Sequence, residues 1–145
     1  MYDPPHFLTP EVLADVLAER TWPAAYVLED DRPDGIDILL PRCHLYVSEG
    51  FESEMTLDFG SDSTGLSRYV SVGEALLALR EDPGRTLPPP PVLANYFSPA
   101  ASLAKVQHQL RDQLALLFTY FQPSLVGDFD WVPAYRAYLA RHGIS

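Results

Sequence analysis

The chain has little that would support metal or disulfide chemistry. Its 145 residues include one cysteine, Cys43, and four histidines. A single cysteine excludes an internal disulfide and a zinc site built from several thiolates. Cys43 lies among apolar residues, which indicates a buried thiol and not a nucleophile. No histidine is spaced from another as metal ligands usually are, so we expect no metal and no cofactor.

Basic residues are also scarce. Lysine and arginine total 10 against 20 aspartates and glutamates, which gives a formal net charge of -10. A surface of that sign repels phosphate, so we expect neither nucleic acid nor an anionic membrane as partner. A basic protein is the natural complement. Solubility alone is the other explanation, because many cytosolic proteins are acidic.

Long apolar runs and catalytic signatures are missing as well. The most apolar stretch, 114–121, is too short to cross a bilayer, and the first residues lack the basic and apolar regions of a signal peptide, so we expect a cytoplasmic protein. The sequence contains none of the glycine-rich phosphate loops, the H-E-x-x-H zinc motif, the G-x-S-x-G elbow or C-x-x-C. Asp58-Phe59-Gly60 spells the kinase magnesium triplet but has none of its companion motifs. We therefore expect no enzyme.

What the chain does have is material for one core. Hydrophobic residues make up 47%, with 7 Phe, 8 Tyr and 2 Trp, and the length suits a single domain spanning 1–145. Capping residues and apolar periodicity predict helices, and alternation predicts strands. The expected helices are 10–21, 71–80, 98–121 and 130–142, and the expected strands are 24–29, 36–40, 43–47 and 51–59.

This order predicts an α+β fold: an antiparallel meander of three or four strands with helices packed on one face. The inward positions switch from even to odd numbers at Pro41-Arg42, so either a bulge or the junction of two strands lies there. The next connection, 48–50, should be a three-residue loop, because an odd loop places apolar residues opposite apolar ones, and Gly50 can adopt a positive φ. Pro88 to Pro91 should form an extended polyproline II segment. One core is expected to hold Val12, Leu13, Val16, Leu45, Val47, Met55, Leu57, Leu103, Val106 and Leu110.

The polar face of the predicted sheet is the candidate functional surface. An ordinary solvated face is the simpler interpretation; the alternative is a recognition surface for a basic partner, with an aromatic anchor among the charges. His44 could face Glu54 or Thr56 across a hairpin, and with Glu52 and Glu54 it could form an acid–base cluster or simply a surface pair. The candidate partner-binding residues are Asp37, His44, Tyr46, Glu52, Glu54 and Asp58.

Three functions agree with these observations. The first is a bacterial immunity protein, which inhibits a cognate basic toxin by protein–protein contact. The second is an acidic chaperone or adaptor for a secreted effector, binding an extended segment along a sheet edge; a homodimer formed through the apolar half of the long helix would favour it. The third is a small enzyme that uses His44 with Glu52 or Glu54.

Overall fold

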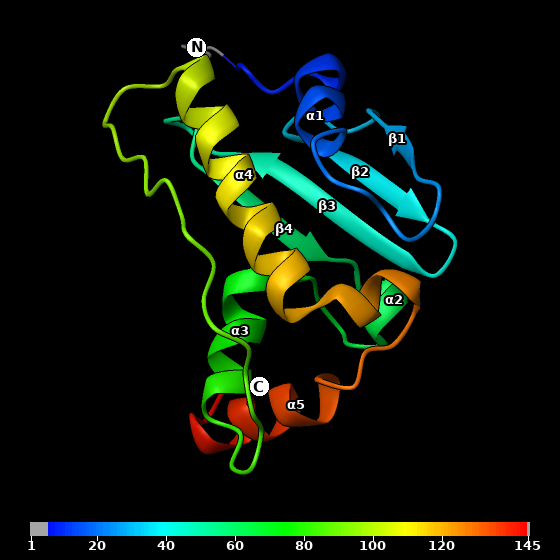
Figure 1. The fold of residues 1–145 in the computed structure, drawn as a ribbon. Helices are drawn as coiled ribbons and strands as arrows, with labels where there is room; N and C mark the ends of the chain where they lie inside the picture. The colour runs from blue at the N-terminus through cyan, green and yellow to red at the C-terminus, as the bar shows by residue number, and fades with distance from the viewer. Residues whose placement is uncertain (1–5, 145) are drawn as a thin grey trace.

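The computed structural model describes residues 6–144 and has the α+β fold that the sequence predicts. Five strands form one antiparallel sheet in the order β1-β2-β3-β4-β5, slightly more than the three or four expected (Figure 1). The strands are β1 (Val27–Glu29), β2 (Gly35–Leu40), β3 (Cys43–Glu49), β4 (Met55–Phe59) and β5 (Val70–Ser71). The helices are α1 (Pro10–Leu17), α2 (Ser61–Thr64), α3 (Val72–Arg80), α4 (Leu103–Tyr120), the 3-10 helix η1 (Gln122–Val126) and α5 (Val132–Arg141).

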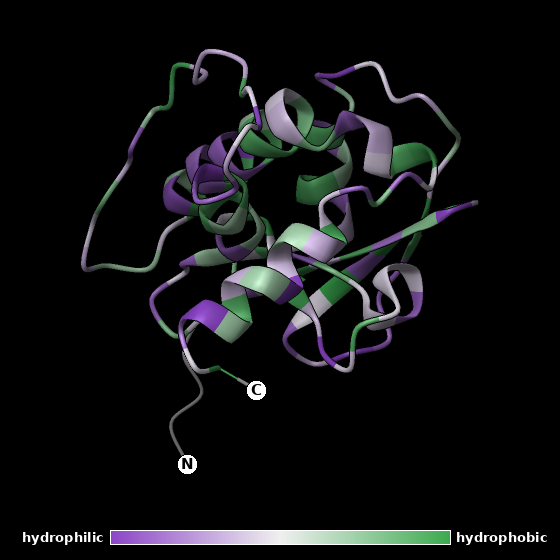
Figure 2. Cartoon of the chain, turned by 90° about the horizontal axis from the view of Figure 1, so that it is seen from below, coloured by the Kyte–Doolittle hydropathy of each residue, from purple (hydrophilic) through white to green (hydrophobic). Residues whose placement is uncertain are grey.

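Helices α1 and α4 lie across one face of the sheet, and α3 and α5 pack together beyond its β4–β5 side (Figure 1). Hydrophilic and hydrophobic residues are mixed along helices and strands in Figure 2, as expected of elements with one side in the core. Eight of the ten predicted core residues are buried together on this side. Val12 is only partly buried, and Leu103 is 42% exposed because it is the first residue of α4.

Helix starts follow local capping chemistry. Thr9 and Ser71 accept hydrogen bonds from the amides of Val12 and Glu74, as their positions predict. The long helix begins at Leu103 and not at residue 98 as expected, because Ser102 caps it by accepting from the Lys105 amide. The last helix begins at Val132, two residues later than expected, with Trp131 and not Asp130 at its cap.

The parity switch at Pro41-Arg42 marks the junction of two strands. Leu40 and Cys43 are paired neighbours, so Pro41 and Arg42 form a two-residue turn between β2 and β3. Cys43 is buried as predicted, and burial, with a smaller contribution from Asp62, raises the pKa of its thiol to about 12. A thiol with that pKa is not a nucleophile at neutral pH.

The turn between β3 and β4 differs from the expectation. Val47 pairs with Leu57, so apolar residues do face apolar ones, but the turn spans residues 50–54 and has five residues instead of three. Ser53, with φ 61°, adopts the left-handed conformation expected for Gly50. The strand therefore begins at Met55, and Phe51, expected to be its first residue, lies in the turn and is 63% exposed.

The buried carboxylate of Glu49 explains this turn. It accepts hydrogen bonds from the Ser53 hydroxyl (2.8 Å) and from the amides of Phe7 and Leu8 (2.9–3.0 Å). These bonds draw Ser53 inward, where it is fully buried, and fix the N-terminal segment against the end of the sheet.

No helix in residues 6–144 has the length and the hydropathy needed to cross a membrane.

Candidate functional site

The sheet has a second face, opposite α1 and α4, which we call the free face. Asp37, Tyr46 and Asp58 are neighbours across β2, β3 and β4, so their side chains form a row on it. His44 lies beside this row on β3. Three residues outside these strands join the cluster: Arg32 before β2, Asp62 in α2, and Tyr69 just before β5. Four of the six predicted site residues are thus brought together here.

His44 is held between two carboxylates. Its Nε2 lies 2.6 Å from Asp37 Oδ1, and its Nδ1 lies 2.9 Å from Asp62 Oδ1. Both ring nitrogens face carboxylate oxygens, an arrangement that favours a proton on each nitrogen. Burial disfavours the resulting positive charge, but the hydrogen bonds and charges of Asp37 and Asp62 outweigh burial and raise the pKa of His44. His44 therefore ties α2 to the sheet through its two carboxylate partners.

Arg32 and Tyr69 cover the middle of the free face. The Arg32 guanidinium lies 4.6 Å from the centre of the Tyr46 ring, donates to the Tyr69 hydroxyl (3.0 Å) and lies 3.4 Å from Asp37. The Tyr46 hydroxyl donates to Asp34 (2.6 Å). Asp37 and Tyr46 are consequently only 4% and 8% exposed. The expectation of an accessible Tyr46 anchor is wrong, because this ring supports the surface from beneath.

Two glycines allow this close packing. A Cβ on Gly35 would lie 2.6 Å from the Tyr46 ring, and a Cβ on Gly60 would lie 2.4 Å from Nδ1 of His44. Neither ring could keep its place if a side chain were present at these positions. The two glycines therefore help to position Tyr46 and His44 on the free face.

The ionised form of Asp58 is destabilised by its surroundings on the free face. Burial, with a further contribution from the negative charge of Glu74, raises the pKa of Asp58 to about 6. The ordinary value is near 4, so the folded chain binds this proton more tightly than the unfolded chain does. Stability from this group is therefore fully present below pH 4 and is lost as the pH rises through 6.

We expect Asp58→Asn to stabilise the chain by about 1 kcal/mol at pH 7.5, a value reduced for solvent screening of the partly exposed carboxylate. The gain should shrink between pH 6 and pH 4, which urea unfolding at a series of pH values would measure. Asp15→Asn, at an exposed acid of α1, is the matched control and should show no such trend. A gain from Asp58→Asn that is constant with pH would contradict the burial of this charge.

A concentration of acids lies at one end of the sheet. The β1–β2 loop and the β3–β4 turn meet there, and the Glu49 amide donates to the carbonyl of Asp34 (3.0 Å). Within residues 6–144, Glu29, Asp30, Asp31, Glu52 and Glu54 are exposed and form no ion pair. The Glu54 carboxylate accepts from the Glu52 amide within the turn. We call this surface the acidic end; its members are Glu29, Asp30, Asp31, Asp34, Glu52 and Glu54.

The acidic end was only partly foreseen. Glu52 and Glu54 were predicted on a strand, and they lie instead in the turn, where they join the acids of the β1–β2 loop. The signal for the remaining members was the run Glu29-Asp30-Asp31 with Asp34, which reads simply as a polar turn. What the sequence does not reveal is that the two acidic loops are adjacent.

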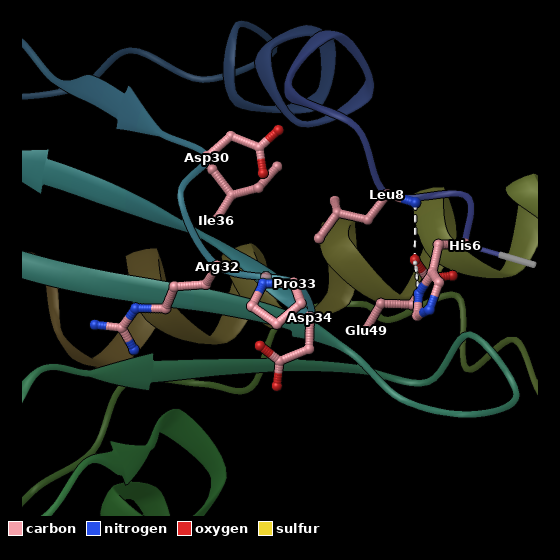
Figure 3. Close-up of a pocket in the computed structure, with 9 residues that line it drawn as sticks. His6, Leu8, Asp30, Arg32, Pro33, Asp34, Ile36 and Glu49 are labelled. Atoms are coloured by element: carbon pink, nitrogen blue, oxygen red, sulfur yellow. Dashed lines mark hydrogen bonds and ion pairs between the residues drawn. The ribbon is translucent and has the colours of Figure 1, made fainter. Parts of the chain in front are cut away.

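A small pocket lies between the acidic end and the N-terminal segment (Figure 3). Asp30, Arg32 and Asp34 line one side, and His6 and Glu49 line the other, where Glu49 points toward the Leu8 amide (Figure 3). The bonds of Glu49 to backbone amides show that this carboxylate serves the fold. The pocket therefore makes the surface beside the acidic end concave, and we assign no catalytic role to Glu49.

The carboxylates of Glu29, Asp31 and Asp37 have oxygens within 4.8 Å of one another, a spacing that metal ligands also show. Asp37, however, is already bound to His44 and lies beside Arg32. Two exposed carboxylates remain, which is a common arrangement on acidic surfaces, and we assign no cation to it.

The acid–base cluster of His44 with Glu52 and Glu54 does not form. His44 lies near the start of β3, whereas residues 50–54 follow its end, so the strand separates the groups by roughly 15–20 Å. The partners of His44 are Asp37 and Asp62 instead. Both ring nitrogens of His44 already contact carboxylates, so this arrangement does not favour general base catalysis.

No protein-family model matches the chain, and no curated protein and no solved structure shows significant similarity to it. The free face and the acidic end therefore provide the grounds for a function.

Proposed function

We propose that this chain is a small acidic binding protein that inhibits a basic partner protein, as an immunity protein inhibits its cognate toxin. The acidic end is the contact surface, and the free face continues it. The observation that carries the proposal is the presence there of exposed carboxylates without cationic partners in residues 6–144. A chain of net charge -10 attracts a basic partner over a long range. The carboxylates of the acidic end, which have no cationic partner within residues 6–144, favour binding at that surface.

The buried cluster of the free face supports this role by making the surface rigid. Arg32 is fixed by Tyr46 and Tyr69, and Asp62 is fixed by His44. Side chains that are already ordered lose less entropy when a partner binds. Asp37, His44 and Tyr46 therefore act as supports of the interface, while the acids of the surrounding loops make the contact.

The test begins with a partner captured from the native cell on the full chain and identified by mass spectrometry. We expect a basic protein whose activity the chain blocks in a purified mixture. The acidic end is then neutralised by Glu29→Gln, Asp31→Asn, Glu52→Gln and Glu54→Gln. The association rate constant, measured in a salt series, should fall by about tenfold or more at low salt and lose most of its salt dependence.

A matched control changes the same charge elsewhere, with Glu11→Gln, Asp15→Asn, Asp128→Asn and Asp130→Asn, all at exposed acids. This variant should associate within about threefold of the wild-type rate, since only the overall attraction is reduced. Equal rates for the two variants, or an acidic partner, would refute the proposal.

A second candidate function, an adaptor that binds an extended segment, rests on the edge strand. β1 lies at the border of the sheet, and its Val27 is exposed, so another strand could pair there. In the apolar half of α4, Leu114, Ala115 and Leu117 are buried within the chain, which does not favour a dimer formed through this half. Binding that survives neutralisation of the acidic end, but is lost when Leu28 is replaced by proline, would favour this adaptor role.

A further inference from the structure

A second surface of the molecule has the opposite character to the acidic end. Residues 86–102, which we call the strap, connect α3 to α4 and contain no charged residue and no histidine. In Figure 1 the strap runs along the outside of the molecule, between the end of α3 and the start of α4. In a chain with 20 acidic residues, such an uncharged exposed stretch requires a physical explanation.

The strap exposes apolar side chains that the core does not use. Pro88, Pro89 and Pro90 are exposed, Val92 is 98% exposed and Phe97 is 83% exposed. Exposed large apolar residues grouped along one segment are typical of a binding surface. Solubility, the alternative explanation for the acidic residues, does not account for this segment.

The prolines of the strap restrict its backbone conformation in the absence of a partner. Four consecutive prolines, Pro88 to Pro91, fix their own φ angles and push each preceding residue into an extended conformation. The structure has no helix, strand or turn there, in agreement with the polyproline II conformation that the run predicts. Within it no amide N–H exists, so its carbonyl oxygens are the only polar backbone groups that a partner can reach.

Both ends of the exposed run are anchored. Leu87 packs against the core on one side. On the other, the Asp112 carboxylate accepts from the amides of Ala94 (2.8 Å) and Asn95 (2.9 Å), and Tyr96 stacks on His108 at 5.1 Å. These contacts reduce the entropy that the strap would lose on binding. They also leave the outer side of the prolines and Val92 free of internal contacts.

We propose that the strap is a second binding site, whose partner is a protein domain with a polyproline-binding groove lined by aromatic rings. Such a groove packs its rings against proline and donates hydrogen bonds from tryptophan or tyrosine to the carbonyls. The uncharged strap offers what this groove recognises and nothing that a basic surface would select. The site is independent of the acidic end, and its binding should be nearly insensitive to salt.

The test titrates the isotope-labelled full chain with three purified domains, one each of the SH3, WW and EVH1 type, and follows the amide signals of Leu87, Val92 and Leu93 by NMR. At least one domain should shift these signals with a dissociation constant of about 1 mM or tighter, and a free oligoproline peptide should reverse the shift. Raising salt from about 50 to 500 mM should change the constant less than about twofold.

Pro89→Ala with Pro90→Ala should weaken this binding by about tenfold, while Pro83→Ala with Pro99→Ala, at exposed prolines flanking the run, should not. Unchanged signals elsewhere in the spectrum show that each variant is folded. The proposal fails if no domain shifts the strap at about 1 mM, or if both double variants bind alike. It also fails if sedimentation reveals a dimer that Phe97→Ser dissociates, since a second copy of the chain would then cover the strap.

Discussion

Replacing Glu49 with alanine should lower the free energy of unfolding by about 3–5 kcal/mol, because the carboxylate is buried and holds several donors. The amides of Phe7 and Leu8 and the hydroxyl of Ser53 all bond to it, and alanine leaves them without a partner. Urea unfolding measures the loss. Hydrogen exchange should show that the Phe7 and Leu8 amides lose protection first, since the contact joins segments 41 and 42 residues apart.

Two further variants separate the hydrogen bonds from other effects. Glu49→Gln retains the shape and one acceptor oxygen, so we expect roughly half the loss of Glu49→Ala. Glu52→Ala removes an exposed acid from the adjoining turn and should change stability by less than about 0.5 kcal/mol. A loss below about 1 kcal/mol for Glu49→Ala would mean that the N-terminal segment does not depend on this carboxylate.

The features that the sequence predicts well are those that neighbouring residues decide. Thr9 and Ser71 cap their helices through bonds to residues three positions away, and alternation along β4 identifies its buried side. Each of these signals lies within a single element. The α+β class follows from their order along the chain.

The features that the sequence does not predict depend on residues far apart in the chain. The β3–β4 turn takes its form from Glu49 and the N-terminal segment, which no local pattern connects. Asp62, one of the two partners of His44, lies in α2, and Arg32, which covers Tyr46, lies in the β1–β2 loop; tertiary packing brings both segments to the sheet. Alternation therefore places Asp37 and Tyr46 correctly on the free face. Their burial could not be predicted, because it depends on loops whose position the sequence does not specify.

The two binding surfaces that we propose differ in the same way: one is set by neighbouring residues and the other by residues far apart in the chain. The proline run can be recognised in the sequence, since its conformation is intrinsic, and the structure adds that it is exposed and anchored. The acidic end has no motif, because it arises from two loops that are separate in the chain. A partner that recognises charge and a partner that recognises proline would contact different segments of the chain, and their affinities would respond differently to salt.

Leu57→Ala should lower the free energy of unfolding by about 2–5 kcal/mol, because Leu57 is 1% exposed and faces the core between β3 and α4. The lost methyl groups leave a cavity that Val47, its neighbour across the strands, cannot fill. Thr56→Ala, one residue earlier and exposed on the free face, should change stability by less than about 1 kcal/mol. Since a strand reverses its side chains at each residue, the contrast between these neighbours tests the register directly. Equal losses in urea unfolding at both positions would show that the register is wrong, and the placement of Asp58 and Tyr46 on the free face would then be wrong as well.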